Sequence, residues 1–234
     1  MSQKADARSE KEAREGTPSR YERRKLETRA KLIRAAHSVM ARKGVDAATV
    51  LEITTEADVG FGSFYNHFKS KDDIARAVFE VRTERLGIVS DQIERSFPNY
   101  AQAIAFVGRV YIEMAHADPV WSWFVIHAQN SVPLMDDILG KRAIRHFERG
   151  VKEDALHISD PYLAGMLTLS SFLSLMRAIL EARVSKAAAI RALGMVLRML
   201  GIPDDEIETA LANDLPAPIK KILAEETENA ELPA

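Results

Sequence analysis

Cysteine is missing from the whole chain of 234 residues. Its absence excludes disulfides, thiolate nucleophiles, iron–sulfur ligation and zinc sites built on cysteine. Long apolar runs are also missing: the longest uncharged stretches, 119–135 and 161–176, carry polar residues. Both fall short of the roughly 20 apolar residues that a membrane span requires. The first twenty residues alternate acidic and basic groups, so we expect no secretory signal and a cytoplasmic location.

A large charge of either sign is likewise absent, since the formal net charge is −2. The charges are unevenly placed, however. Residues 1–75 hold 15 basic and 12 acidic groups, and the remainder holds 17 and 22. The sharpest excess lies at 20–34, where seven basic residues accompany two acidic ones. This segment indicates either an anionic partner near that end or simply a solvated helix face.

What the chain has in abundance is helical periodicity. From residue 24 onward apolar residues recur about every 3.6 positions, and no convincing strand pair is present, so we predict an all-α fold. Gly44 is predicted to end the first helix as a left-handed cap, and Ser70 to cap a long helix that can bend at Gly87. Asp118 and Asp160, each followed by proline, are predicted N-caps. The expected helices span 24–43, 71–97, 100–117, 119–130, 133–156, 161–184, 186–200 and 203–212.

A helix-turn-helix pattern follows the first predicted helix. Residues 49–55 are rich in β-branched side chains, which favours a strand, but their apolar positions also fit one face of a short helix. Asp58 can adopt the left-handed conformation that a tight turn requires. A second short helix is expected over 60–67, with Phe64 and Phe68 facing the core. In this motif the second helix lies in the major groove of DNA.

The same region resembles the TetR family of transcriptional regulators, over about residues 24–80. The pattern as a whole outweighs the strand propensity, because tertiary context overrides weak local preference. The matching stretches are Ala35-Ala36, Gly44, Thr49, Glu56-Ala57, Val59, Gly62-Ser63-Phe64-Tyr65, His67-Phe68 and Ser70-Lys71.

The resemblance implies an N-terminal three-helix DNA-binding domain, joined by a long helix to a C-terminal helical domain for ligand binding and dimerisation. On this basis we expect a disordered N-terminal arm at 1–19 and a helix-turn-helix domain at 20–72. The effector-binding and dimerisation domain is expected at 73–215, followed by a tail at 216–234.

Residue roles follow from the resemblance where the residues match. Phosphate contacts, which fix register and affinity, are expected from Thr49, Tyr65, His67 and Lys71. Base contacts are expected from Phe61, Gly62, Ser63 and Asn66, since Asn can bind adenine and Phe can touch a thymine methyl group.

Three positions depart from the family pattern. Relatives often have Ser at the position of Gly60, Lys or Arg at Phe61, and Gly at Asp58. The missing basic group at 61 puts guanine recognition there in doubt. An alternative role for Phe61 is that of a partly exposed packing residue.

The C-terminal part is expected to dimerise and to bind a ligand. The helix at 161–184 is apolar on most sides, so it must be buried on several sides. The resemblance implies that it pairs, with the helix at 186–200, against the same helices of a second copy; an ordinary monomeric core is the alternative. Residues that can line a pocket for a small apolar or aromatic effector, or simply form the core, are Phe106, Tyr111, Trp121, Phe124, His127 and Met176.

The predicted protein is therefore a ligand-responsive repressor that binds a palindromic operator as a homodimer, without catalytic activity, cofactor, metal or membrane. Two alternatives remain at this point. One is a DNA-binding organiser that responds to no ligand. The other is a di-metal carboxylate enzyme. It is suggested by the Glu-x-x-His spacing of Glu113 and His116, and by the same spacing, with Asp in place of Glu, in Asp154 and His157.

Overall fold

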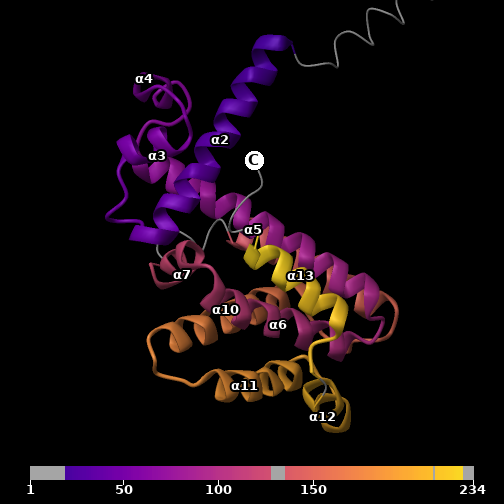
Figure 1. The fold of residues 1–234 in the computed structure, drawn as a ribbon. Helices are drawn as coiled ribbons and strands as arrows, with labels where there is room; N and C mark the ends of the chain where they lie inside the picture. Colours follow the sequence, from indigo (N-terminus) through magenta and orange to yellow (C-terminus); the bar gives the residue numbers. More distant parts are fainter. Residues whose placement is uncertain (1–18, 128–134, 213, 229–234) are drawn as a thin grey trace, which may run out of the picture.

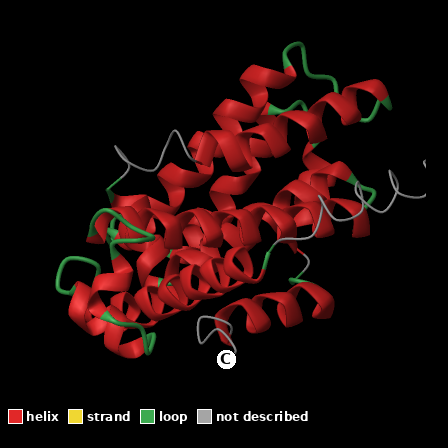
Figure 2. Cartoon of the chain, turned by 90° about the horizontal axis from the view of Figure 1, so that it is seen from above, coloured by secondary structure: helices red, strands yellow, loops and turns green. Residues whose placement is uncertain are grey.

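The computed structural model describes residues 19–127, 135–212 and 214–228. Every regular element within these ranges is a helix, which confirms the predicted all-α fold (Figure 2). The elements are α2 (Arg20–Lys43), α3 (Val50–Glu56), α4 (Phe61–Phe64), α5 (Lys71–Ser96), α6 (Tyr100–Ala117), α7 (Pro119–Ile126), a π-helical turn (Asp136–Gly140), α9 (Lys141–Lys152), α10 (Pro161–Leu180), α11 (Lys186–Met199), α12 (Asp204–Ala212) and α13 (Ala217–Glu228).

The N-terminal domain is formed by α2, α3, α4 and the first turns of α5, which pack around a small core (Figure 1). The side chains at its centre are fully buried: Leu32, Met40, Ile53, Phe64 and Ile74 each have an exposed fraction of 0%. The β-branched segment is helical and buries Ile53 and Thr54 against this core, so tertiary context overrides its strand propensity. At about 1.5 Å per residue, α5 is about 39 Å long and continues from this domain into the second.

Most of the predicted helix ends are confirmed by their caps. The hydroxyl of Ser70 accepts from the backbone N–H of Asp73, and the Asp160 carboxylate accepts from that of Leu163. Gly44 ends α2 as predicted, but not as a left-handed cap. Its φ of 89° and ψ of 152° lie in an extended region of positive φ that is open essentially to glycine alone.

The second domain is arranged around α6, which contacts α5, α7, α10, α11, α12 and α13. Trp121, Phe147 and Met176 come from three different helices and are almost fully buried. In Figure 1, α11 and α12 lie at the end of the molecule farthest from α3 and α4. The two domains thus share α5, with α3 and α4 at one end of the molecule and α11 and α12 at the other.

Gly87 does not interrupt α5, which runs unbroken past it. A Cβ atom at this position would lie 2.7 Å from the guanidinium of Arg142, so the glycine makes room for that side chain. Arg142 uses the space to donate to Glu84 at 2.9 Å and to Asp91 at 3.3 Å. The glycine therefore serves packing between α5 and α9 rather than a bend.

Several predicted boundaries are wrong. The second helix of the motif ends at Phe64, not at residue 67, and turns follow it. The predicted helix 119–130 ends at Ile126, and 128–130 lie outside the described residues. The predicted helix 133–156 is a π-helical turn followed by α9, which ends at Lys152 before Asp154 takes a φ of 56°. The predicted helix 161–184 ends at Leu180, since Ala182 adopts a φ of 55°.

The segment expected to be only a tail contains a further helix, α13. Ile219 is 1% exposed, and α13 lies against α6 (Figure 1). The two prolines at 216 and 218 suggested a break, but proline is tolerated in the first turn of a helix, where its missing N–H leaves no bond unmade. Residues 1–18 of the arm predicted at 1–19 lie outside the described residues, and Ser19, its last residue, is the N-cap of α2.

Candidate nucleic-acid interface and effector domain

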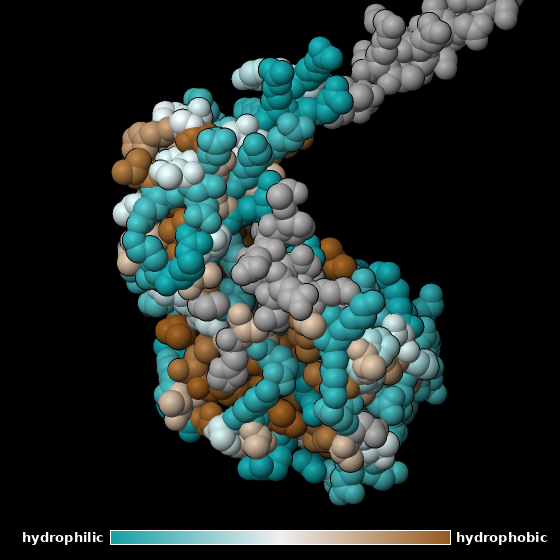
Figure 3. All heavy atoms as spheres, viewed as in Figure 1, coloured by the Kyte–Doolittle hydropathy of each residue, from teal (hydrophilic) through white to brown (hydrophobic). Residues whose placement is uncertain are grey.

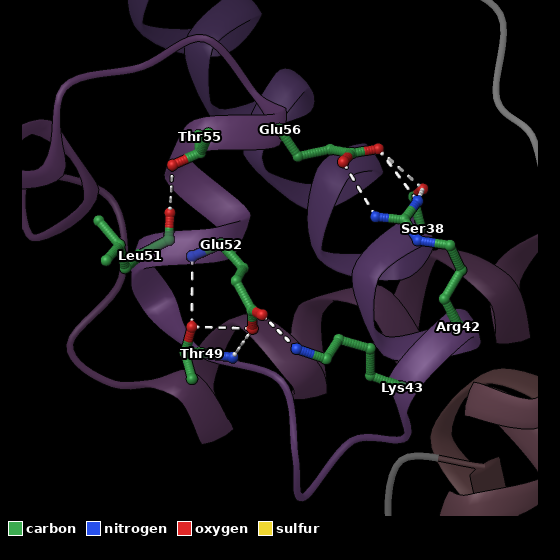
Figure 4. Close-up of polar contacts among 8 residues, drawn as sticks. All are labelled: Ser38, Arg42, Lys43, Thr49, Leu51, Glu52, Thr55 and Glu56. Atoms are coloured by element: carbon green, nitrogen blue, oxygen red, sulfur yellow. Dashed lines mark hydrogen bonds and ion pairs between the residues drawn. The ribbon is translucent and has the colours of Figure 1, made fainter.

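Ion pairs at the surface connect α3 with the end of α2 (Figure 4). Arg42 donates to both carboxylate oxygens of Glu56, at 3.2 and 3.0 Å, and Ser38 donates to Glu56 at 3.0 Å. Lys43 pairs with Glu52 on the neighbouring turn. Hydrogen bonds from Arg42 and Ser38 lower the pKa of Glu56, so its carboxylate remains charged. These exposed contacts add to the packing of Ile53 in joining the first helix of the motif to α2.

Thr49 caps α3 within a full capping box that sequence reasoning missed. Its hydroxyl accepts from the N–H of Glu52, and the Glu52 carboxylate accepts from the N–H of Thr49 at 3.1 Å. The signal was present in the sequence, since Thr followed three residues later by Glu is the pattern of a capping box.

The turn between α3 and α4 is tight and left-handed. Asp58 has a φ of 51°, as predicted, and its N–H donates to the carbonyl of Thr55 at 3.2 Å. The N–H of Val59 donates to the carbonyl of Thr54 at 3.0 Å, and the Val59 side chain packs against the core. An Asp therefore serves where relatives usually have Gly, because a short polar side chain tolerates this conformation.

The residues predicted to read bases lie together at the surface of α4 and the turn after it. Phe61 is 50% exposed and Asn66 is exposed, while Ser63 is half-buried. Gly62 is exposed, and a Cβ atom there would meet nothing within 4 Å, so no contact within the described chain requires a glycine at this position. Phe64 and Phe68 face the core as predicted.

The four residues predicted to contact phosphates differ in their surroundings. Tyr65 is 55% exposed, and its ring packs edge-on against that of Phe61 with 5.7 Å between centroids. His67 is half-buried, and burial, together with the charges of Lys25 and Arg29, lowers its pKa. Its ring is therefore neutral at neutral pH.

Lys71 and Thr49 already have partners within the chain. The ammonium of Lys71 donates to the backbone carbonyl of Asp46 at 2.6 Å, which ties the start of α5 to the loop after α2. The Thr49 hydroxyl donates to Glu52 at 2.9 Å. Both residues lie on the same end of the molecule as α4, and their contacts with phosphate stay a prediction.

A buried charged cluster joins the two domains, and sequence reasoning missed it. Asp118 is 0% exposed, Arg82 is 3% and His37 is 1%. Arg82 Nε donates to Asp118 Oδ2 at 2.7 Å, and His37 Nε2 lies 3.4 Å from Oδ1. Asp118 Oδ1 also accepts from the N–H groups of Val120 and Trp121, each at 3.0 Å, so it caps α7 as predicted.

Burial alone would raise the pKa of Asp118, but the His37 hydrogen bond, the Arg82 charge and the Trp121 N–H together lower it to about 2. The carboxylate is thus ionised in the interior and connects α2, α5 and the junction of α6 with α7. Because Arg82 and His37 lie 36 and 81 positions away in the chain, no local pattern could have revealed the cluster.

Five of the six predicted effector residues are buried in the second domain, and one is not. Phe106, Tyr111, Trp121, Phe124 and Met176 are at most 5% exposed. His127 is exposed and stacks on Trp123, with 4.2 Å between ring centroids. A cleft of about 410 Å³ lies elsewhere, between the start of α6 and the α11–α12 junction, and none of the six lines it.

Polar groups are sparse within this apolar interior. The hydroxyls of Tyr111 and Ser90 lie 3.4 Å apart, and burial raises the pKa of Tyr111, so that its hydroxyl stays protonated. Thr168 is 3% exposed and its Oγ1 has no hydrogen-bond partner. It precedes by one helical turn Phe172, whose ring packs edge-on against Tyr111 at 5.6 Å. A π-helical turn, a feature often found at functional sites, contacts α10 and α5.

The outer side of α10 and α11 carries an apolar face (Figure 3). Its large side chains are 39% to 70% exposed, and we call them the α10–α11 face: Tyr162, Leu163, Met166, Leu167, Met195 and Met199. Of the described helices, α10 alone has the length and composition to cross a membrane, yet 44% of its most apolar window is buried inside the protein.

The residues suggested for a metal centre do not come together in the described part of the chain. Glu113 accepts from Lys186 at 2.5 Å. Asp154 and His157 lie at the surface, 3.8 Å apart. Within the described ranges no group of three or more His, Cys, Asp or Glu side chains is placed to hold a metal ion. The side chain of His116 lies outside what the structure describes.

Two short helices joined by a tight turn, fixed on a third helix and linked to a separate helical domain, define a one-component helix-turn-helix regulator. The family models for bacterial regulatory proteins of the tetR family and for the tetracyclin repressor-like C-terminal domain match residues 32–78 and 99–212. The chain belongs to the TetR family of transcriptional regulators, whose members are regulators and not enzymes. No curated protein sequence matches it significantly.

Solved structures support this assignment. RolR in complex with its ligand resorcinol is 30% identical, with a TM-score of 0.71, and the match covers 83% of this chain and 97% of RolR. RolR without ligand is 32% identical, with a TM-score of 0.67, covering 80% and 98%. A TetR-family transcriptional regulator from Pectobacterium atrosepticum is 22% identical over 78% of this chain and 97% of its own, with a TM-score of 0.68, and shares the fold.

Proposed function

We propose that this regulator binds a palindromic operator as a homodimer, represses transcription, and releases the DNA when a small aromatic effector binds. The observation that carries the proposal is the surface made by Phe61, Gly62 and Asn66. Phe61 and Asn66 are exposed on this motif, and no contact within the described chain requires Gly62 to be a glycine. In a helix-turn-helix, such side chains reach base edges in the major groove.

The α10–α11 face supports the homodimer. Soluble monomers rarely expose contiguous apolar patches of this kind, and such patches mark association sites. A two-fold axis through this face would pair α10 and α11 with their symmetry mates and present two copies of α4 to the DNA. Half-sites about one helical turn, roughly 34 Å, apart would then form an inverted repeat.

Selection of bound sequences from random duplex DNA tests the proposal directly. We expect an inverted repeat, bound with an affinity that falls steeply as the salt concentration rises. A protein that enriches no duplex, or whose binding does not depend on salt, would show that the α4 surface is not a DNA interface.

Replacing Asn66 with Ala is expected to change the preferred half-site. An amide that bonds adenine N6 and N7 contributes about 1–3 kcal/mol of discrimination against other bases, so its loss should relax the preference at one base pair. Repeating the selection with the variant measures this. The matched comparison is Tyr65→Ala, which removes a predicted phosphate contact and should weaken binding to all sequences alike. An unchanged base preference in Asn66→Ala would disprove the role of Asn66.

The nature of the effector is inferred from the interior of the second domain. RolR, at 30% identity, is known in complex with resorcinol, a small aromatic diol. The core of this chain offers aromatic walls together with the hydroxyls of Tyr111, Ser90 and Thr168, of which Thr168 lacks a partner. A small phenol would satisfy such hydroxyls and bury its ring among the surrounding aromatic side chains. The effector releases DNA only if it binds more tightly to a conformation of the dimer that does not fit the operator than to the conformation that does.

Resorcinol is therefore expected to stabilise the protein and to release it from the operator. At about 100 times its Kd, a ligand adds about 2.7 kcal/mol to the free energy of unfolding. Tyr111→Phe should weaken binding about tenfold, because it removes one hydrogen bond worth about 1.4 kcal/mol. Calorimetry measures both. The control is Tyr100→Phe, whose hydroxyl donates to Glu153 at 2.8 Å near the remote cleft.

Equal affinity of wild type and Tyr111→Phe would disprove this site. Failure of resorcinol and of every other small phenol to release the operator would instead favour a DNA-binding organiser without an effector.

A further inference from the structure

The N-terminal half of α2 extends beyond the rest of its domain. Its first buried side chain is Leu32, so the preceding three turns contribute no buried side chain to the core. The family model for the DNA-binding domain begins only at residue 32, so this extension precedes the matched region. In Figure 1 it rises past α4, on the end of the molecule opposite the second domain, and Figure 3 shows it as hydrophilic.

Packing does not explain why this extension is helical. A helix of about 12 residues without a buried face is marginal in water. Here it is held by continuity with the packed half of α2 and by a capping box, in which Ser19 and Glu22 satisfy each other's backbone N–H groups at 2.7 and 3.1 Å. The extension is thus kept ordered while its side chains remain at the surface.

The positive charge of the extension is not neutralised within the described chain. Elsewhere in the protein many Arg and Lys side chains pair with carboxylates, as Arg42 and Arg142 do. By contrast, among the described residues no ion pair involves any of the seven basic residues of the segment: Arg20, Arg23, Arg24, Lys25, Arg29, Lys31 and Arg34. A row of unneutralised cations beside a DNA-binding motif attracts an anion from outside the chain.

Two of these cations adjoin the turn that follows α4. Arg29 lies over the ring of Phe68, with Cζ 5.0 Å from the centroid. Lys25 lies one turn earlier on the same face of α2. The charges of both act on the half-buried His67, whose Nδ1 is buried without a hydrogen-bond partner. With the pKa of His67 lowered, the cations whose charges act on its ring are Lys25 and Arg29 of α2.

We propose that Lys25 and Arg29, on the extension of α2, bind phosphates of the DNA backbone beside the groove that α4 enters. This inference rests on the proposed operator binding and adds to it a second, sequence-independent contact surface. Phosphate contacts of this kind fix the orientation of the protein and raise its affinity without reading bases.

The double variant Lys25→Gln/Arg29→Gln tests the inference on the selected operator. Each lost phosphate contact reduces the slope of log affinity against log salt by about 0.9, so two contacts in each of two protomers should reduce it by about 3.6. We expect affinity to fall at least about tenfold near physiological salt, with the same preferred sequence. Phosphate ethylation interference should disappear at specific backbone positions. Lys25→Arg/Arg29→Lys keeps both charges and should restore the wild-type slope.

The matched control is Arg145→Gln/Lys152→Gln, which removes two exposed charges from α9 and should leave the slope unchanged. An unaltered slope in Lys25→Gln/Arg29→Gln, while Tyr65→Ala weakens binding, would overturn this inference and leave the proposed function standing. Failure of the wild type to bind any selected duplex would overturn both.

Tyr21 and Leu26 are 75% and 61% exposed on the same helix. If the wild type binds vesicles containing anionic lipid, and Lys25→Gln/Arg29→Gln loses this binding but binds DNA unchanged, the partner of the extension is a membrane surface.

Discussion

Replacing Asp118 with Ala is expected to lower the free energy of unfolding by about 3–5 kcal/mol, because removing one member of a buried ion pair leaves the other charge uncompensated. Arg82, at 3% exposure, would lose its carboxylate partner, and the N–H groups of Val120 and Trp121 would lose their acceptor. Chemical denaturation measures the change.

The control for this prediction is Asp204→Ala. Asp204 also pairs with an arginine, Arg198, at 2.7 Å, but the two side chains are 70% and 56% exposed. Exposed pairs contribute at most about 1 kcal/mol, so the loss should be small. Equal losses in the two variants would mean that the buried cluster does not stabilise the junction between the domains.

The same carboxylate makes stability depend on acid pH. Its pKa is about 2 in the folded protein against 3.8 as the ordinary value. A group whose folded pKa is depressed contributes stability that is fully present above the unfolded pKa and is lost as pH falls towards the folded pKa. The contribution is about 2.4 kcal/mol, and it should vanish between about pH 4 and pH 2. In Asp118→Asn this part of the acid dependence should be absent.

Replacing Leu167 with Glu is expected to dissociate the proposed dimer and to weaken binding to the proposed operator at least about a hundredfold. Leu167 is 53% exposed on the α10–α11 face, and a two-fold axis would bring two new carboxylates into an apolar interface. In a dimer, binding of one protomer to its half-site holds the other protomer at a high effective concentration near the second half-site. Separate monomers lose this gain in affinity. Sedimentation equilibrium and fluorescence anisotropy measure the two effects.

Ile88→Glu, on α5, is the matched control, since Ile88 is 50% exposed and lies outside this face. It adds the same charge and should leave both the dimer and operator binding intact. Should Leu167→Glu and Met195→Glu both remain dimeric, the α10–α11 face would not be the interface.

The buried cluster also bears on how the domains communicate. Asp118 caps α7 in the second domain, while its partner His37 belongs to the helix that carries the DNA-binding motif. Trp123, also in α7, donates to Asp46 at 3.2 Å in the loop between α2 and α3. A shift of α7 would therefore act on α2 through the buried contact with His37, and on the loop after α2 through the exposed contact with Asp46.

Much of the candidate DNA interface was predictable because its determinants are local. The Thr49 cap, the left-handed Asp58 and the buried pair Phe64 and Phe68 depend on neighbours within a few positions. The length of the second helix of the motif was not predictable. Helix propensity and apolar period do not indicate where this helix ends and the following turns begin. The helix was predicted over 60–67, but it ends at Phe64.

The sequence by itself determined the helical class of this protein and the capped ends of its main helices, since both follow from apolar period and capping chemistry. The residues expected to contact DNA were implied by the resemblance to the TetR family. The tertiary structure alone decided the remainder: the buried Asp118 cluster, the room that Gly87 leaves for Arg142, the packing of α13, and the exposure of His127. These features depend on residues far apart in the chain, whose approach is set by how whole helices pack and leaves no trace in the local pattern.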